Sequence, residues 1–214
     1  MDDPFAPERN RMVQWQIEGR GVRDTRVLQA MREVRRHEFV PEVARALAYR
    51  DCPLAIGFGQ TISQPYIVGW MSELLELQPG HRVLEVGAGC GYQTAVLARL
   101  CAEVFALERL DALTQMARAN LERAGAANVQ LRTGDGCLGW PEEAPFDAVL
   151  VAAASPMIPR ALIEQLAPGG RLVIPLGSSE GQVMTRLSKD EQGETTREYL
   201  GEVAFVPLIP GEPG

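Results

Sequence analysis

The stretch with the clearest chemical meaning covers residues 83–94 and reads Val-Leu-Glu-Val-Gly-Ala-Gly-Cys-Gly-Tyr-Gln-Thr. A short apolar strand carries the acid Glu85 and runs into a loop whose glycines, Gly87, Gly89 and Gly91, are spaced G-x-G-x-G. Glycine leaves the backbone bare, and a helix that begins there turns its positive end toward a ligand. The pattern predicts a nucleotide-type ligand. Tyr92 after the third glycine breaks the dinucleotide spacing G-x-G-x-x-G, which disfavours an NAD-dependent dehydrogenase.

Two further acids follow at the ends of the next predicted strands. The position of Glu108 suits a carboxylate that accepts hydrogen bonds from both ribose hydroxyls, and Asp135, within Gly134-Asp135-Gly136, suits an acceptor for an exocyclic adenine amine. Each of these features also has a purely structural interpretation. The glycines can form a tight turn, Glu108 can be a solvated residue at the end of a strand, and Asp135 can be an ordinary turn residue. Their order along one chain favours a shared pocket, because parallel sheets bind ligands at the carboxyl ends of their strands.

Other reactive side chains receive plainer interpretations. Cys90 lies inside the glycine loop, where we expect a small side chain that fills a tight place rather than a reactive thiolate. Asp147 opens a strand at the opposite edge of the sheet, and we expect a structural role for it. His37 and His81 show no metal-ligand spacing with a cysteine, so we expect neither a metal site nor a histidine base.

The elements that must position these groups form an α/β pattern. Apolar strands separated by helices of about 10–14 residues predict a mostly parallel sheet with helices on both faces. We expect one domain over residues 1–214, with a disordered stretch at 1–8, a helical segment at 9–50, a loop without regular structure at 51–63 and an α/β core at 80–210. Strands are expected at 82–86, 103–107, 128–132, 147–152 and 171–176, core helices at 91–101, 111–124 and 159–167, and a final hairpin with strands near 182–187 and 200–206.

Composition narrows the class of protein. The chain has 214 residues, a net charge of −7 and 46% hydrophobic residues, as in an ordinary globular domain. The acidic balance argues against affinity based on nucleic-acid phosphates. Four cysteines without C-x-x-C spacing indicate free thiols in a reducing compartment. With no signal peptide and no apolar run of about 18 residues, we expect a cytoplasmic protein that does not bind membranes, and a monomer as the simplest state.

Two segments resemble known enzymes. An acid followed by G-x-G-x-G after a strand resembles the first motif of S-adenosylmethionine-dependent methyltransferases. Upstream, residues 57–66 read Gly-Phe-Gly-Gln-Thr-Ile-Ser-Gln-Pro-Tyr, which resembles a loop of the protein-L-isoaspartate O-methyltransferases. The other family-like segments are in the expected order: residues 83–94, Gly134-Asp135-Gly136, Pro145-Phe146-Asp147-Ala148, 166–170 and Phe205-Val206-Pro207-Leu208.

The resemblance implies a Rossmann-like methyltransferase fold, a mostly parallel sheet of about seven strands with N-terminal helices. It implies S-adenosyl-L-methionine as cofactor and methyl transfer to the α-carboxylate of L-isoaspartyl residues in damaged proteins and peptides, which starts repair through a succinimide. It implies Ser63 as the active-site residue in a cleft lined by residues 60–63. The cofactor-binding residues that it implies are Gln60, Thr61, Ile62, Glu85, Gly87, Gly89, Cys90, Glu108, Arg109, Asp135 and Gly136.

Alternatives stay open at this point. Ser63 precedes Gln-Pro and a predicted helix, so its hydroxyl can also be read as a plain N-cap, and both roles are compatible. The same scaffold can methylate RNA or a small molecule, although the strand end at Ala152-Ala153-Ala154-Ser155-Pro156 lacks an N-P-P-Y-like amine clamp. A non-enzymatic cofactor-binding module would be expected to have a damaged glycine loop or to lack one of the acids.

Overall fold

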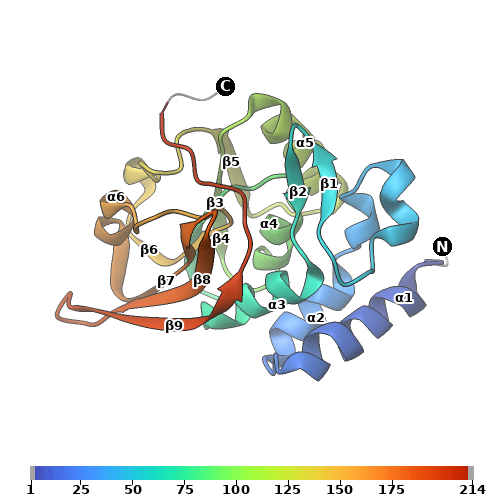
Figure 1. Ribbon diagram of the computed structural model, residues 1–214, viewed down its shortest axis with the longest axis horizontal. Coiled ribbons are helices and arrows are strands. Elements are labelled where there is room, and N and C mark those ends of the chain that lie inside the picture. The colour runs from blue at the N-terminus through green and yellow to red at the C-terminus, as the bar shows by residue number, and fades with distance from the viewer. Residues whose placement is uncertain (1–2, 212–214) are drawn as a thin grey trace.

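A seven-stranded sheet organises the chain in a computed structural model that describes residues 3–211 (Figure 1). Its order is β5-β4-β3-β6-β7-β8-β9, with parallel pairing from β5 to β7 and antiparallel pairing from β7 to β9. The prediction of a mostly parallel sheet of about seven strands is confirmed. The strands of this sheet are β3 Arg82–Val86, β4 Glu103–Glu108, β5 Val129–Thr133, β6 Phe146–Val151, β7 Leu166–Ser178, β8 Gly181–Lys189 and β9 Thr195–Val203.

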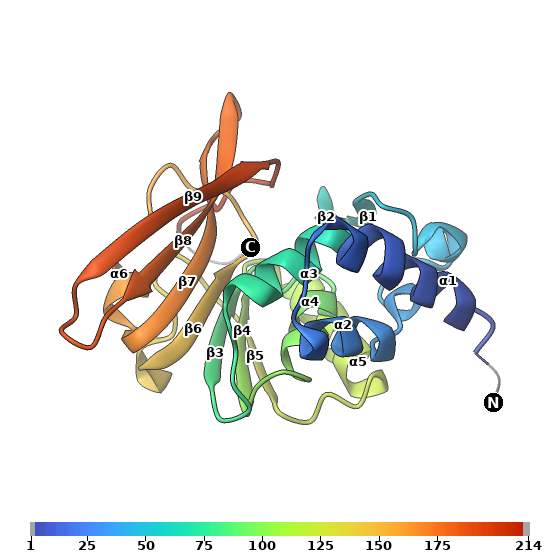
Figure 2. The ribbon, with the colours of Figure 1, turned by 90° about the horizontal axis from the view of Figure 1, so that it is seen from below.

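Helices cover both faces of the parallel part, and alternate strand residues point to opposite sides. Val83 packs in a cluster with α2, α3, α4 and α5, whereas the next residue, Leu84, packs in a second cluster with α6. Figure 2 shows the first layer of helices on one side and the long antiparallel strands reaching out on the other. The helices are α1 Ala6–Arg11, α2 Thr25–Glu33, α3 Pro65–Leu74, α4 Tyr92–Leu97, α5 Asp111–Arg123 and α6 Arg160–Glu164. None of these elements within residues 3–211 has the length and hydropathy of a membrane span.

The N-terminal segment departs from its prediction at both ends. Residues 3–8 are ordered, because Asp3 pairs with Arg9 at 2.7 Å and Phe5 stacks on His37. Residues 1 and 2 lie outside the described chain. After α1 the helix widens into a π-helix, Met12–Ile17, before a 3-10 turn at Glu18–Arg20. A π-helix brings residues five apart together. Met12 and Ile17 are therefore buried together, whereas Trp15 is 67% exposed.

Asp24 caps α2 as predicted, because its Oδ1 accepts hydrogen bonds from the backbone N–H groups of Arg26 and Val27. The short helix expected at 41–48 is a 3-10 helix over Glu42–Leu47, and further 3-10 turns lie at Arg36–Glu38 and Pro141–Glu143. The core helices are also shorter than predicted: α4 spans Tyr92–Leu97 and α6 spans Arg160–Glu164.

The expectation of irregular structure over residues 51–63 is wrong. Strands β1 Leu54–Gly57 and β2 Gln60–Ile62 form an antiparallel hairpin that stands beside α3 (Figure 1). Its tip is a left-handed turn, with φ of 94°, 54° and 70° at Gly57, Phe58 and Gly59. Gly57 and Gly59 make such a turn accessible, so the glycines that favour a loop also form the corner of a hairpin.

The last part of the sheet is more extended than predicted. β7 already begins at Leu166 and includes Pro168-Gly169-Gly170, which was expected to form a turn before the strand; the irregularity appears instead as a shift in register against β6. The hairpin tip between β8 and β9 lies at residues 190–194. Beyond β9 the chain crosses back over the sheet as residues 204–211, called the strap below (Figure 1).

Candidate functional site

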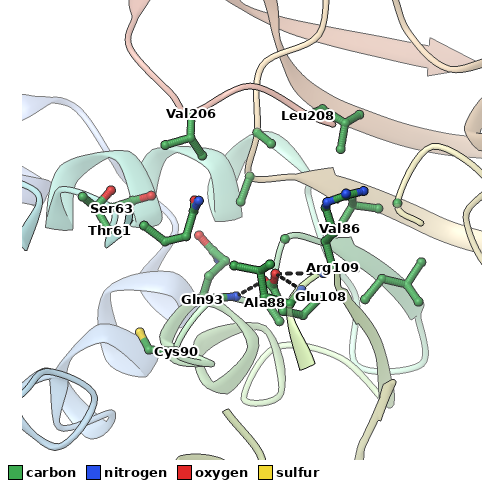
Figure 3. A pocket seen from close by; sticks show the side chains of 18 of the residues that line it. Thr61, Ser63, Val86, Ala88, Cys90, Gln93, Glu108, Arg109, Val206 and Leu208 are labelled. Carbon is green, nitrogen blue, oxygen red and sulfur yellow. Dashed lines mark hydrogen bonds between the residues drawn. The ribbon is translucent and has the colours of Figure 1, made fainter. Parts of the chain in front are cut away.

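A pocket lies at the carboxyl ends of β3, β4 and β6, between the glycine loop and the strap (Figure 3). The space between its walls is about 990 Å³ when the open solvent at its mouth is included. Ten of the twelve predicted site residues line it: Gln60, Thr61, Ile62, Ser63, Gly87, Gly89, Cys90, Glu108, Arg109 and Gly136. Glu85 and Asp135 do not line it.

The floor of the pocket is the glycine loop 87–91, which rests on the end of β4. The N–H groups of Gly87 and Ala88 both donate to the carbonyl of Leu107, at 2.8 and 3.1 Å. Gly87 has a φ of 90°, a conformation that residues with a side chain rarely adopt. A ligand can therefore approach bare backbone here, as the sequence predicts.

Glu108 holds this loop in place. It is buried, and its Oε2 accepts a hydrogen bond from the N–H of Gly89 at 2.8 Å. Its Oε1 accepts from the N–H groups of Arg109 and Leu110 at 2.8 and 3.0 Å. A carboxylate has about four acceptor positions, so roughly one remains, on Oε2. That Glu108 accepts from both ribose hydroxyls stays a prediction, and one such bond fits without displacing a backbone donor.

Glu85 lies beneath the floor rather than in it. Its side chain is fully buried, and neither carboxyl oxygen has a hydrogen-bond partner among the described residues. Burial raises the pKa of Glu85 to about 8, with Thr94 lowering it and the nearby Glu108 raising it. The prediction that Glu85 touches the cofactor has no support from the lining of the pocket. The structure indicates a neutral acid that supports the loop from below.

Asp135 and Gly136 follow β5 and have separate roles. Asp135 Oδ1 accepts from the N–H of Cys137 at 2.8 Å, and Oδ2 accepts from the N–H of Gly211 at 2.7 Å. Gly136 forms part of the wall, and a Cβ built on it would lie 2.2 Å from Cγ1 of Val86 and 3.4 Å from Cδ1 of Leu208. Glycine is thus required by space at this position, whereas the predicted contact of Asp135 with an adenine amine is not favoured by its present partners.

Ser63 lies at the end of the pocket opposite Glu108, next to Thr61 (Figure 3). It is not the N-cap of α3: that residue is Gln64, and it makes no capping hydrogen bond through its side chain. A second hollow adjoins the first at Ser63 and shares Thr61, Ser63, Ala152 and Val206 with it. Ser63 therefore stands where the two hollows meet, which the capping interpretation does not explain.

Cys90 lies at the edge of the pocket, and its thiol points toward the N-terminal helices (Figure 3). Burial raises the pKa of Cys90 to about 11, although the neighbouring Arg36 lowers it. A thiol with such a pKa is neutral and poorly nucleophilic near pH 7. This agrees with the interpretation of Cys90 as a small side chain in a tight place. Within residues 3–211 the four cysteines form no disulfide.

The roof of the pocket, formed by the strap, was missed as part of the site. Figure 3 shows Val206 and Leu208 opposite Ala88 and Glu108, and Pro207 and Ile209 also line the pocket. The strap pairs with Ala154, three residues after β6, through hydrogen bonds from Ala154 N to Val206 O and from Leu208 N to Ala154 O, at 2.8 and 2.7 Å. The sequence of this segment, Phe205-Val206-Pro207-Leu208, resembles the family, but its apolar side chains do not indicate a binding or catalytic role. Other lining residues not predicted are Val68, Val86, Ala88, Tyr92, Gln93, Leu107, Leu110, Gly134, Ala152 and Ala153.

The site suits a nucleoside with a charged tail. Apolar side chains from opposite walls, Leu110 and Leu208, can enclose a flat base, and Glu108 keeps an acceptor position for a hydroxyl. Bare backbone at the glycine loop admits a close approach at the other end.

Comparisons with known proteins agree with this geometry. The model of the protein-L-isoaspartate(D-aspartate) O-methyltransferase family matches residues 8–213. A protein-L-isoaspartate O-methyltransferase of Methylorubrum extorquens is 56% identical over 206 residues, which cover 96% of this chain and 90% of the relative. One from Methanoculleus marisnigri is 53% identical, with coverage of 97% and 94%.

Solved structures give the same result. A protein-L-isoaspartate O-methyltransferase superimposes with a TM-score of 0.83 at 30% identity, over 96% of this chain and 67% of that one. A Plasmodium falciparum protein described as a putative protein-L-isoaspartate O-methyltransferase, in complex with S-adenosyl-L-homocysteine, superimposes with a TM-score of 0.81 at 26% identity, over 94% and 98%. The chain therefore belongs to the protein-L-isoaspartate(D-aspartate) O-methyltransferase family.

Proposed function

We propose that this chain transfers a methyl group from S-adenosyl-L-methionine to the α-carboxylate of L-isoaspartyl residues in damaged proteins and peptides. The observation that carries the proposal is the position of Ser63 between two adjoining hollows. One hollow has the floor and roof of a nucleoside site, and the other opens beside it at the end where a methyl acceptor must approach. Family membership supplies the identity of the acceptor.

Each residue has a role that its contacts support. Glu108 shapes the glycine loop and offers an acceptor to the cofactor's sugar, while the loop backbone approaches its amino-acid end. Gln60, Thr61 and Ile62 form the wall that leads to Ser63. The hydroxyl of Ser63 donates a hydrogen bond to the acceptor carboxylate and thereby sets its angle of approach.

The chemistry needs little more than alignment. The acceptor is an Asp-like or α-carboxyl group with an unperturbed pKa of about 4, so it is ionised at neutral pH without a base. When bound, S-adenosylmethionine supplies an electrophilic methyl group on a sulfonium. Positioning two reactants can contribute roughly 7–11 kcal/mol at best. The backbone nitrogen that follows the side-chain carbonyl of the isoaspartyl linkage then attacks the ester carbonyl and expels methanol, which forms a succinimide, and hydrolysis of the succinimide returns some normal aspartate.

Paired peptides test the proposal. Two peptides of one sequence, with L-isoaspartate or L-aspartate at a single position, are incubated with labelled S-adenosylmethionine. We expect methylation of the isoaspartyl peptide to be faster by orders of magnitude. Equal labelling of both peptides, or labelling only of an RNA or small-molecule acceptor, would contradict the proposal. Binding of the cofactor without transfer to any acceptor would indicate a non-enzymatic module.

The proposal extends to the setting of the reaction. We propose a cytoplasmic monomer that acts on proteins and peptides and binds neither nucleic acid nor membranes. The net charge of −7 supports the exclusion of nucleic acid, and the unpaired cysteines fit a reducing compartment. Light scattering of the purified chain measures the oligomeric state directly.

A further inference from the structure

The far end of the strap is held by two charged side chains from neighbouring strand ends. Asp135, which follows β5, accepts the N–H of Gly211 on Oδ2 at 2.7 Å. Arg109, which follows β4, places Nη1 3.2 Å from the carbonyl of Gly211 and 3.5 Å from those of Ile209 and Pro210. Both residues therefore bind the backbone of one short segment.

The near end of the strap is held independently. Gln182 on β8 pairs with both backbone groups of Phe205: its Oε1 accepts from the N–H, and its Nε2 donates to the carbonyl at 3.0 Å. Ala154 binds Val206 and Leu208, as described above. The four residues that form the roof, 206–209, thus lie between a fixed near end and the contacts of Asp135 and Arg109.

Asp135 itself is absent from the lining of the pocket, and both of its oxygens are engaged by backbone N–H groups. Its position explains a hold on the strap better than a direct contact with the ligand. Arg109 lines the pocket, but its guanidinium donates hydrogen bonds to carbonyl groups of the strap. Both groups are accessible to water, so their hydrogen bonds can break and reform without disturbing the core.

We propose that Asp135 and Arg109 are positioning residues that latch the strap over the bound cofactor and thereby set how long the cofactor stays. The identity of the cofactor rests on the proposed function; the latch itself does not. Opening the latch frees the roof from its far end, while the floor, on which association depends, keeps its shape. The latch should therefore act on the dissociation rate more than on the association rate.

A double-mutant cycle in the full-length chain tests the latch. Asp135→Asn weakens the acceptor, and Gly211→Pro removes the N–H that Asp135 accepts and excludes the φ of 103° found there. We expect each variant to raise the dissociation rate of S-adenosyl-L-homocysteine about tenfold, on the order of one hydrogen bond to a charged group. The double variant should be no faster than Gly211→Pro alone, because Asp135→Asn weakens a contact that Gly211→Pro has already removed.

Arg109→Gln should act in the same direction, and Arg109→Lys should restore part of the effect because it keeps a cationic donor. Glu122→Gln, which neutralises an exposed carboxylate on α5, is the matched control and should change nothing. Additive effects of Asp135→Asn and Gly211→Pro would overturn the proposal, since a direct contact of Asp135 with the ligand predicts additivity.

Hydrogen exchange in the ligand-free protein separates the latch from the proposed function. The latch variants should exchange faster than the wild type at residues 205–211, with melting temperatures within about 2 °C of the wild type. Unchanged exchange there would overturn the latch, whatever the ligand. Faster exchange in a protein that does not bind S-adenosyl-L-homocysteine would support the latch and contradict the proposed cofactor.

Discussion

The floor and the roof of the pocket enclose the same space and are held in different ways. The floor follows β3, whose last four residues are buried, and its N–H groups are bound by a strand carbonyl and by the buried Glu108. The roof has no strand of its own: backbone hydrogen bonds join Val206 and Leu208 to Ala154, and half-exposed side chains hold its two ends. Opening the floor requires unfolding of the core, whereas the roof can open locally. The binding site thus combines a permanent half with a movable half.

The largest expected effect concerns the ionisation of Glu85 below the floor. Its folded pKa of about 8 lies above the ordinary 4.5, so the folded state binds more protons than the unfolded state between these values. The contribution of Glu85 to the free energy of unfolding is therefore complete below pH 4.5 and is lost as the pH rises from there through about 8. At roughly 1.4 kcal/mol for each pKa unit, the loss reaches several kcal/mol. Denaturant unfolding of the ligand-free protein at a series of pH values measures it.

Glu85→Gln cannot ionise and should remove most of the fall in the free energy of unfolding between pH 4.5 and 8. Glu122→Gln, which changes an exposed carboxyl, is the matched control. If Glu85→Gln leaves the pH dependence of unfolding unchanged, Glu85 does not have a raised pKa in the folded protein.

Removing Glu108 should damage the floor and spare the roof. Glu108→Ala deletes the acceptor for the N–H of Gly89 together with the position offered to the cofactor. We expect binding of S-adenosylmethionine to weaken by roughly 1.5–3 kcal/mol, the scale of hydrogen bonds to a charged group. Calorimetry measures the affinity, and hydrogen exchange should rise at residues 87–91 but not at 205–211. Unchanged affinity in the folded variant would remove Glu108 from the site.

Ser63 stands where floor, roof and acceptor hollow meet, and its loss should separate binding from turnover. Ser63→Ala should lower turnover about 10- to 150-fold, the equivalent of roughly 1.5–3 kcal/mol, with little change in cofactor affinity. A nucleophilic serine would instead lose nearly all activity and leave a covalent adduct. Ser178→Ala, at the exposed end of β7, is the control. Normal turnover with a lowered melting temperature would mean that Ser63 is only structural.

The smallest expected effect tests the near end of the roof. Gln182→Ala removes the paired hydrogen bonds to Phe205, worth about 1 kcal/mol each when neutral. Because the roof opens locally, exchange at residues 205–208 should rise about fivefold or more while global unfolding changes by less than about 1 kcal/mol. Gln130→Ala on the edge strand β5 is the matched control. A large fall in global stability would show that the roof unfolds together with the core.

The same contrast explains what the amino-acid sequence could predict. The floor depends on local rules, since an apolar strand, three spaced glycines and an acid at the next strand end specify a loop wherever they occur. The predicted residues Gly87, Gly89, Cys90 and Glu108 accordingly line the pocket. The roof depends on Val206, Pro207, Leu208 and Ile209, whose side chains carry no chemistry and whose position comes from contacts with β6 and β8. Such contacts between distant parts of the chain leave no periodic pattern.

Two predicted ligand contacts, those of Glu85 and Asp135, have no support from the lining of the pocket. Glu85 was expected at the ligand because it belongs to the glycine motif, but its place within β3 turns its side chain beneath the loop. Asp135 was expected to meet an adenine amine, but Gly211, which lies 76 residues later in the chain, occupies one of its oxygens. The hairpin β1–β2 was read as a loop because Gly57 and Gly59 break a strand as readily as they turn one.

The close approach of Gly136 to Val86 has an evolutionary consequence. A Cβ at position 136 would lie 2.2 Å from Cγ1 of Val86, so the fold cannot hold valine at 86 and alanine at 136 at the same time. Valine is stiff at χ1 and cannot swing aside without strain. A lineage that acquires alanine at 136 must therefore first or simultaneously shrink residue 86, and a later return to valine is blocked until glycine is restored. Positions 86 and 136 are expected to diverge as a pair, with residue 86 becoming smaller before residue 136 becomes larger.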